Sequence, residues 1–200
     1  MAAQFRHASV VRPALTGAFP NLKNATWRIK SPSDDTYQCI AWAACRTDRK
    51  WWPVDHPEFY WPPKSPVIVA PPLPLLWFTP VDYMIQGFRT LGYQPCDSHE
   101  FEFGYQKVAI YENETGATHM ARQHFLGRGW LSKLGNAEDI FHGKLTDIEG
   151  STVAMAFQYG EVAQILKRSW WAALVRLCLF RCWWTAFRHW LYRMAHPSWK

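Results

Sequence analysis

Proline crowds the middle of this chain and decides where regular structure can form. Nine of the fourteen prolines lie between residues 53 and 80. Because proline lacks the backbone N–H that a helix interior or a central strand needs, this segment holds neither a long helix nor a central strand. Long loops inside compact domains are usually functional or disordered. The tryptophans and tyrosines of residues 51–61 favour a functional loop, one that packs on the surface and walls a cleft.

The residues on either side of this loop predict a helix followed by an antiparallel meander. Apolar spacing predicts two helical turns from Cys39 to about Cys45, capped by Thr36 or Asp35. The other expected elements are a helix at 79–91, strands at 27–30, 107–111, 118–125 and 129–134, a helical turn at 137–142, and a helix that begins at 160–168. A helix that begins at a cysteine and packs on an antiparallel sheet is an α+β arrangement.

Length and charge divide the chain into three parts. Two hundred residues fit one domain with an appendage. Residues 1–18 show no sustained period and predict a loosely ordered lead-in, while residues 19–168 predict the domain. Residues 167–200 hold seven Lys or Arg and no acid, whereas the other 166 residues carry 15 basic and 16 acidic groups. The domain is therefore nearly neutral, and its charge does not predict nucleic-acid binding.

The third part, residues 169–200, predicts a basic, tryptophan-rich helix over 169–195. Its arginines do not share one face at 100° per residue. Because arginine in mid-span is costly in hydrocarbon, we do not expect this helix to cross a membrane. Two interpretations remain open: attachment to an anionic membrane surface, and packing on the domain itself or on a protein partner.

Cysteine usage indicates the compartment. The chain has five cysteines, an odd number, and they form no CxxC pair. This pattern predicts free thiols in a reducing compartment, and the lack of an apolar leader before Phe19 favours a cytoplasmic location. No zinc-ligand spacing and no Gly-rich phosphate loop occur in the sequence, so we expect neither a metal nor a cofactor.

Cys39 and His119 are the residues most suited to chemistry. Cys39 follows a polar run and opens an alanine-rich helix, and His119 lies near the start of a predicted strand. A thiol becomes a good nucleophile when a helix N-terminus and an imidazole lower its pKa. The two residues need to be close in space and not in sequence. The alternatives are a buried apolar cysteine and a structural histidine.

A Cys–His pair needs supporting groups. A third polar residue would orient the imidazole, and we rank Asp139 and Asn136 above Ser132 because a carboxylate or amide accepts the imidazole N–H well. Gln38 is positioned to stabilise an oxyanion. The aromatic residues expected to line the substrate cleft are Trp42, Trp51, Trp52, Tyr60 and Trp61.

Several phrases of the sequence resemble a widespread bacterial domain family whose members read Tyr-Asn-Cys-Ile-Ala-Trp-Ala, then Thr-His-Ala-Ala-Arg-Gln and Ser-Lys-Leu-Gly. The matching phrases here are Tyr37-Gln38-Cys39-Ile40-Ala41-Trp42-Ala43, Trp51-Trp52-Pro53, Leu91-Gly92-Tyr93, Thr118-His119-Met120-Ala121-Arg122-Gln123, Ser132-Lys133-Leu134-Gly135 and Tyr159-Gly160. The likeness covers about residues 19–168, with Gln38 in place of Asn. The order of cysteine helix and histidine strand is similar to that of papain-like thiol hydrolases.

This resemblance implies a papain-like fold and a thiol hydrolase or acyl transferase that acts on an amide bond. Cys39 would be the nucleophile, and His119 the general base and then the acid. The substrate would be a peptide or a protein. The alternative is a non-catalytic module of the same fold that holds a peptide in the aromatic cleft.

Overall fold

The protein is described by a computed structural model. It covers residues 8–68, 80–150 and 159–171, together with Phe187, Leu191 and Met194, and the statements below concern these residues.

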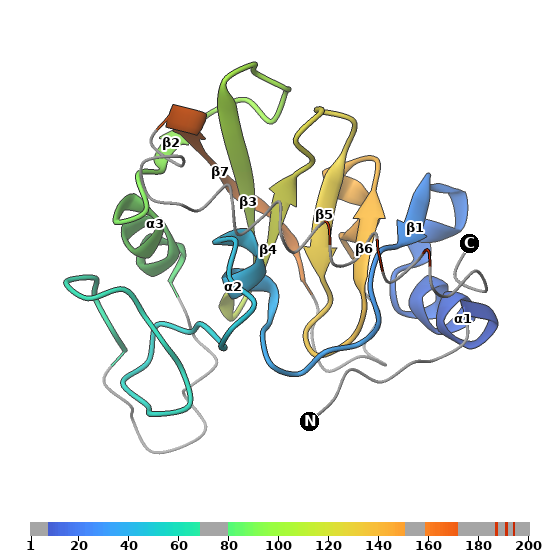
Figure 1. Cartoon of the computed structure of the whole chain (residues 1–200), viewed down its shortest axis with the longest axis horizontal. Helices are drawn as coiled ribbons and strands as arrows, with labels where there is room; N and C mark the ends of the chain where they lie inside the picture. Colours follow the sequence, from blue (N-terminus) through green and yellow to red (C-terminus); the bar gives the residue numbers. More distant parts are fainter. Residues whose placement is uncertain are drawn as a thin grey trace.

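An open, antiparallel sheet of seven strands forms the centre of the molecule (Figure 1). The strand order is β1-β6-β5-β4-β3-β7-β2. Strands β3 to β6 form a meander, in which neighbours along the chain are also neighbours in the sheet, and β7 returns to pair between β3 and β2. The strands are β1 (Trp27–Ile29), β2 (Gln94–Cys96), β3 (Tyr105–Asn113), β4 (Gly116–Gln123), β5 (Trp130–Lys133), β6 (Asp139–His142) and β7 (Glu161–Ser169).

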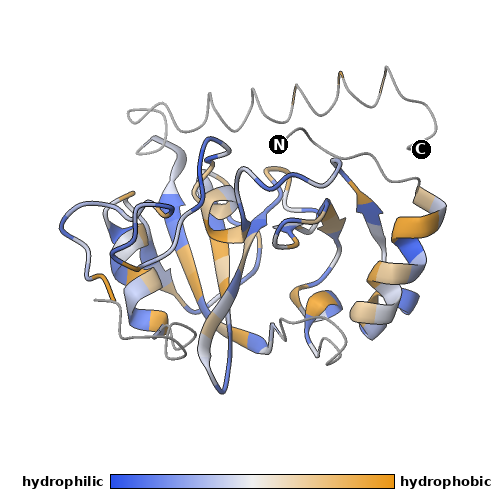
Figure 2. Ribbon diagram, turned by 90° about the horizontal axis from the view of Figure 1, so that it is seen from below, coloured by the Kyte–Doolittle hydropathy of each residue, from blue (hydrophilic) through white to orange (hydrophobic). Residues whose placement is uncertain are grey.

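Helices cover the sheet on both sides. One side, which we call the α2 face, is covered by α2 (Cys39–Ala43) and α3 (Val81–Arg89). The other side, the α1 face, is covered by α1 (Ala8–Ala18) and the short 3-10 helices η1 (Pro20–Asn24) and η3 (Leu145–Ile148). In Figure 2 the apolar colour is concentrated on the strands and on parts of the helices, as expected for two cores that share one sheet.

Strand alternation assigns each side chain to one face. Successive residues of a strand point to opposite faces. On β3, Ile110 lies in the core of the α2 face and Tyr111 in that of the α1 face. On β4, Met120 belongs to the α2 face and Ala121 to the α1 face. Even-numbered residues in this part of β4 therefore point toward α2, and odd-numbered residues point away from it.

Most of the predicted elements are present: the cysteine-headed helix, the 79–91 helix, and the strands at 27–30, 107–111, 118–125 and 129–134. Three predictions were wrong. Residues 161–169 form strand β7 and not a helix, because their backbone pairs with β3 on one edge and with β2 on the other. Residues 139–142 form strand β6, fully buried between β1 and β5. The lead-in contains α1, whose apolar residues Val11 and Leu15 pack into the core of the α1 face.

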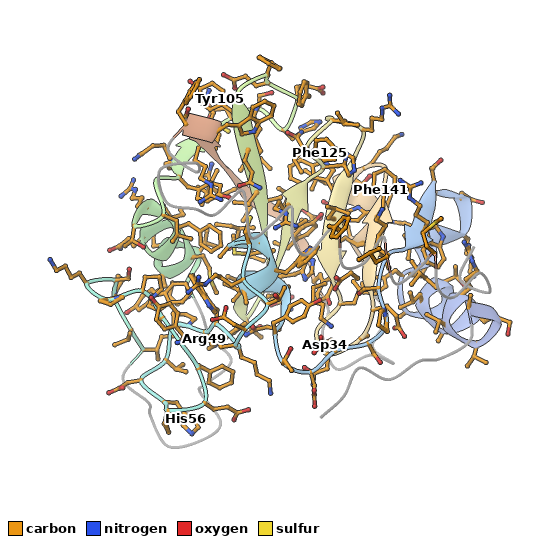
Figure 3. All side chains as sticks on the ribbon, viewed as in Figure 1. Asp34, Arg49, His56, Tyr105, Phe125 and Phe141 are labelled. Carbon is orange, nitrogen blue, oxygen red and sulfur yellow. The ribbon has the colours of Figure 1, made fainter. Side chains whose placement is uncertain are left out.

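The proline-rich loop, predicted for residues 51–80, behaves as predicted over residues 51–68, the part of it that is described before Pro80. It contains isolated bridges but no helix or strand, and the bridges join Trp51 to Tyr60 and Val54 to Ile68. Figure 3 shows His56 on this loop and Arg49 just before it, beside the lower end of the sheet. The rings of Trp51 and Tyr60 lie 4.9 Å apart, and Trp51 is buried against the α2 core. The loop is thus fixed to the domain by its aromatic residues.

The predicted C-terminal helix at 169–195 falls almost entirely outside the described residues. Within the part of the chain that is described, no helix is both long enough and apolar enough to cross a membrane.

Candidate functional site

Helix α2 begins at Cys39, with Gln38 as its N-cap residue in extended conformation. The predicted capping by Thr36 does not occur, because its hydroxyl donates to Asp34 Oδ1 at 2.6 Å. Gln38 makes no capping bond either. Its amide pairs with the backbone of Trp51: Nε2 donates to Trp51 O, and Trp51 N donates to Oε1 at 2.8 Å. This paired amide ties the proline-rich loop to the start of α2.

A pocket of about 370 Å³ opens at this junction. Cys39, 5 % exposed, lies at the pocket. Its wall comes from the proline-rich loop, the start of α2, strand β4, the turn after β5 and the segment before β7. The lining residues are Gln38, Cys39, Lys50, Trp52, Val54, Phe59, Thr118, Gly135, Asn136 and Tyr159. The site therefore combines one thiol with an aromatic and apolar wall.

The environment of Cys39 contains opposing influences. Burial raises the pKa of the thiol to about 11. Hydrogen bonds from the backbone of Met120 and Ile40, and the charge of Lys133, lower the pKa but do not compensate for the burial. At neutral pH the sulfur is therefore protonated in this structure, unlike the thiolate of an activated cysteine.

The structure does not bring His119 to Cys39. His119 is an odd-numbered residue of β4 and points to the α1 face. There its ring stacks on Tyr159 at 4.0 Å and meets Tyr111 edge-on at 5.4 Å. Neither ring nitrogen has a hydrogen-bond partner, so no bond joins it to the Cys39 sulfur. The predicted Cys39–His119 pair has no hydrogen bond in this structure, because strand alternation places His119 on the side of Tyr111 and away from α2.

Burial also makes His119 a poor acid. The buried position, and after it the charge of His142, hold the pKa of His119 well below its usual range. The ring is neutral at pH 7 and packs between two tyrosines. The ring is therefore held by these two aromatic contacts and not by hydrogen bonds.

The three candidates for orienting His119 lie in different places. Asn136 lines the pocket beside Cys39. Asp139 is buried on the α2 side and accepts a hydrogen bond from the Tyr37 hydroxyl at 3.1 Å. Ser132 is buried on the α1 face, with its Oγ 2.9 Å from Nε2 of His142. None of the three is bonded to His119.

The sequence reasoning missed Lys133 as part of this site. Ser132 points to the α1 face, so its neighbour Lys133 points to the α2 face, where its Nζ lies 5.1 Å from the centre of the Tyr37 ring. The side chain is fully buried, and burial lowers the pKa of Lys133 while Asp139 raises it. The phrase Ser-Lys-Leu-Gly did contain this residue. Only the strand parity shows which face it takes.

The five aromatic residues predicted to line a substrate cleft lie in different places. Trp52 lines the pocket, but Trp42, Trp51 and Trp61 are buried in the core of the α2 face, and Tyr60 packs against that core. Phe59 and Tyr159, which we did not predict, line the pocket. Large aromatic side chains bury extensive area, so those nearest to α2 stabilise the fold and only the outer ones remain for a ligand.

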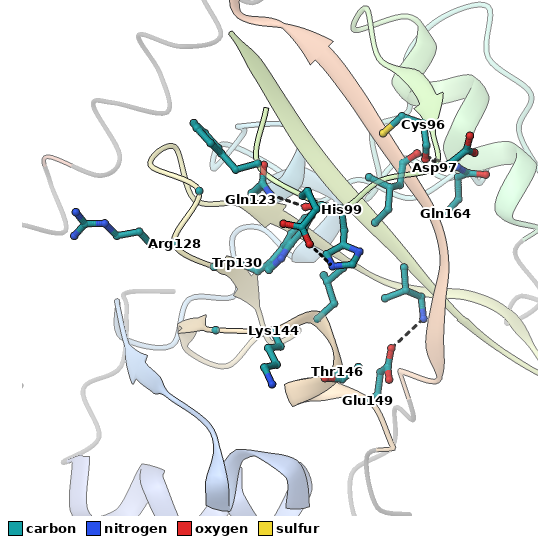
Figure 4. A pocket seen from close by; sticks show the side chains of 18 of the residues that line it. Cys96, Asp97, His99, Gln123, Arg128, Trp130, Lys144, Thr146, Glu149 and Gln164 are labelled. Atoms are coloured by element: carbon teal, nitrogen blue, oxygen red, sulfur yellow. Dashed lines mark hydrogen bonds and ion pairs between the residues drawn. The ribbon is translucent and has the colours of Figure 1, made fainter. Parts of the chain in front are cut away.

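A larger cavity of about 840 Å³ lies on the α1 face (Figure 4). Its lining is polar and of mixed charge, with Gln123 bonded to the backbone of His99 and with Lys144 and Glu149 on one side. Its thiol, Cys96, is half-buried and faces Ser98 O. We assign the candidate site to the smaller pocket, because there a free thiol meets converging backbone donors and a buried cation.

We predicted that all the cysteines are free thiols, and this prediction was wrong for one of them. Cys39 and Cys96 are free, whereas Cys45 is disulfide-bonded. Among the described residues, no three His, Cys, Asp or Glu side chains come together in a way that could hold a metal ion.

Comparison with known proteins places the chain in a family. No curated protein and no solved structure matches it. A family model does match, over residues 28–167, which include α2, α3, all of β2 to β6 and most of β1 and β7. The chain belongs to the family described as a domain of unknown function, DUF7689.

Proposed function

We propose that this domain is a thiol-dependent hydrolase or acyl transferase that acts on an amide bond of a peptide or protein, with Cys39 as the nucleophile. The observation that carries the proposal is the position of Cys39. It is a free thiol at the head of a helix, and it opens to a pocket whose other walls suit an apolar side chain. A papain-like relationship is part of this proposal and rests on the sequence resemblance alone.

The pocket supplies the other groups that acyl transfer needs. Trp52 and Phe59 offer an apolar wall for a side chain of the substrate. Asn136 brings an amide to the same pocket, where its N–H groups can stabilise the oxyanion of a tetrahedral intermediate. Gln38, the residue predicted for that task, already donates to the Trp51 backbone and serves mainly to fix the wall.

The competing function is a peptide-binding module that performs no chemistry. Two observations favour it: burial raises the pKa of the Cys39 thiol, and His119 faces the other side of the sheet. In this function the same pocket binds an apolar side chain, and Cys39 is merely a small apolar residue of its floor.

A small activated acyl donor separates the two functions. The full chain is treated with p-nitrophenyl acetate at pH 7.5, and the acetylated cysteines are identified by peptide mass spectrometry. A hydrolase should acetylate Cys39 at least tenfold faster than Cys96, although Cys96 is the more exposed thiol. Cys39→Ala should abolish the fast release of p-nitrophenolate, and Cys96→Ala should leave it intact. Slower reaction at Cys39 than at Cys96 would leave the binding module as the function.

A further inference from the structure

The catalytic proposal lacks a base once His119 is removed from the site, and the α2 face contains another candidate. Lys133 is the last residue of β5 and is fully buried. It shares the α2 face with Cys39, and its charge acts on the pKa of Cys39 just as Cys39 acts on that of Lys133. Gly135 and Asn136, two and three residues further on, line the Cys39 pocket. Lys133 therefore directly precedes the turn whose residues line the Cys39 pocket.

Several contacts fix the Lys133 side chain. Its Nζ donates to the backbone oxygen of Ala137, across the turn that carries Asn136. The ammonium also lies over the ring of Tyr37, two residues before Cys39. Asp139 is the direct cross-strand neighbour of Lys133 in the β5–β6 register.

Tyr37 joins these groups into one network. Its ring contacts Lys133, and its hydroxyl donates to Asp139 Oδ2 at 3.1 Å. The backbone N–H of Asp139 in turn donates to Ser31 Oγ. A surface lysine has none of these constraints, since its long side chain normally extends into water. Burying an ammonium costs free energy, so a lysine held in this way needs a reason beyond packing.

We propose that Lys133 is the basic partner of Cys39: its Nζ accepts the thiol proton during attack on the substrate, while Tyr37 and Asp139 hold the side chain in position. This inference rests on the proposed function. It replaces the thiolate–imidazolium pair that the sequence predicts with a thiol–amine pair, for which buried lysines are suited.

Burial favours the uncharged form of both partners. Burial lowers the pKa of Lys133, which increases the fraction of neutral amine, and burial raises the pKa of Cys39, which keeps the thiol protonated. The charged groups that face Lys133 are Asp139, Asp34 and Glu138, and all three raise its pKa. Removing the charge of Asp139 should therefore make the amine easier to deprotonate.

The proton and electron pairs balance through one cycle. The Cys39 sulfur attacks the carbonyl carbon of the amide, and its proton moves to the Lys133 amine, directly or through one water. The C–N bond then breaks, and the leaving amine takes that proton from the Lys133 ammonium. Water or an acceptor amine then attacks the resulting thioester and gives a proton to Lys133. The C–S bond breaks, and the Cys39 sulfur takes that proton back from the Lys133 ammonium. No oxidant, reductant or further reactant is required.

The test uses the full chain and the acetylation of Cys39 by p-nitrophenyl acetate. Lys133→Met keeps an unbranched side chain but removes both base and charge, and Lys133→Arg keeps the charge but cannot act as a base. We expect both variants to lower the acetylation rate constant of Cys39 by about 100-fold, the usual lower range for a general base. His119→Gln is the matched control on the α1 face and should change the rate less than about threefold. Thermal unfolding confirms that each variant is folded.

A pH profile provides a readout that a merely structural lysine would not change. In the wild type the acetylation rate should rise with pH as Lys133 loses its proton. Asp139→Asn should move this rise to lower pH, because it removes the neighbouring charge that stabilises the ammonium. A Lys133→Arg variant that reacts at the wild-type rate, or a profile that Asp139→Asn leaves in place, would overturn the inference. If the wild type itself is not acetylated at Cys39, the proposed function fails first.

Discussion

The two faces of the sheet have similar cores but hold different sets of ionisable groups. The α2 face carries Cys39, Lys133 and Asp139 close to a pocket that opens to solvent. The α1 face carries His119 and His142, which are both buried and packed against neighbours. The comparison shows that strand parity decides which groups can react together. In the sequence, His119 is a plausible partner for Cys39. In the sheet, the residue of β4 that faces α2 is its neighbour Met120.

The contacts of His142 explain why the α1 face is structural. Its Nδ1 lies 2.7 Å from Lys144 O, which can only accept, so Nδ1 carries the proton. Its Nε2 then accepts from the Ser132 hydroxyl at 2.9 Å. Both nitrogens of the neutral ring are satisfied, and burial lowers the pKa of His142 to about 4. Ser132 and His142 are fully buried and no ring nitrogen is left for a further hydrogen bond, so the pair stabilises the fold and cannot contact a substrate.

The largest expected effect comes from a matched deletion in the two cores. Ile110 on the α2 face and Ile140 on the α1 face are both fully buried. Replacing either with alanine should lower the free energy of unfolding by about 2–5 kcal/mol, measured in urea, because each leaves a cavity. Only Ile110→Ala should also change the acetylation rate of Cys39, since it removes the cross-strand neighbour of Met120 from the core cluster that contains Cys39. Equal effects of both variants on Cys39 would mean that the two faces are not independent.

Local sequence signals predicted much of this fold. Apolar periodicity and turn residues located α2, α3 and four of the seven strands, because those signals act within a few residues. They missed the short strand β2, and they failed for β6 and β7. Both strands pair with residues distant in sequence, β7 with β3 (Ile165 with Ala109) and β6 with β1 (Ile140 with Ile29), and β6 is buried on both faces, so it shows no alternation. Long-range pairing overrides local propensity at these positions.

The candidate site was less predictable for a related reason. The position of Cys39 at a helix start could be inferred from the order of residues along the chain. The partner of the thiol could not, because it depends on the parity of β4 and β5 relative to α2. A shift of one residue exchanges His119 for Met120 and Ser132 for Lys133. Sequence patterns locate strands within a few residues and do not fix this parity.

The pH dependence of stability should have opposite signs on the two faces. Burial raises the pKa of Asp139 to about 6, so the folded state binds this proton more tightly, and stability falls as pH rises from about 4 to 6. Burial lowers the pKa of His142 to about 4, so the unfolded state binds that proton more tightly, and stability rises between about pH 4 and 6.5. Each contribution is about 3 kcal/mol, from 1.36 kcal/mol per pKa unit.

Urea unfolding at several pH values between 4 and 7 separates these contributions. Across this pH range the unfolding free energy should rise by about 3 kcal/mol more in Asp139→Asn than in the wild type. In His142→Gln it should rise by about 3 kcal/mol less than in the wild type. His119, whose pKa is also lowered by burial, keeps part of the rise in the second variant. A shallower rise in Asp139→Asn would show that its carboxyl is not held protonated by burial, and would remove the contrast between the faces.

The smallest expected effect comes from deleting one hydroxyl on each face. Tyr37→Phe removes the donor to Asp139 but leaves the ring that contacts Lys133, and Ser132→Ala removes the donor to His142 Nε2. At pH 7.5 the first bond has an ionised acceptor and the second a neutral one, so we expect losses of about 2 and about 1 kcal/mol in unfolding free energy. Only Tyr37→Phe should also alter the acetylation rate of Cys39, because Asp139 then has one donor fewer and its charge acts more strongly on Lys133. If Ser132→Ala changes that rate and Tyr37→Phe does not, the reactive network lies on the α1 face after all.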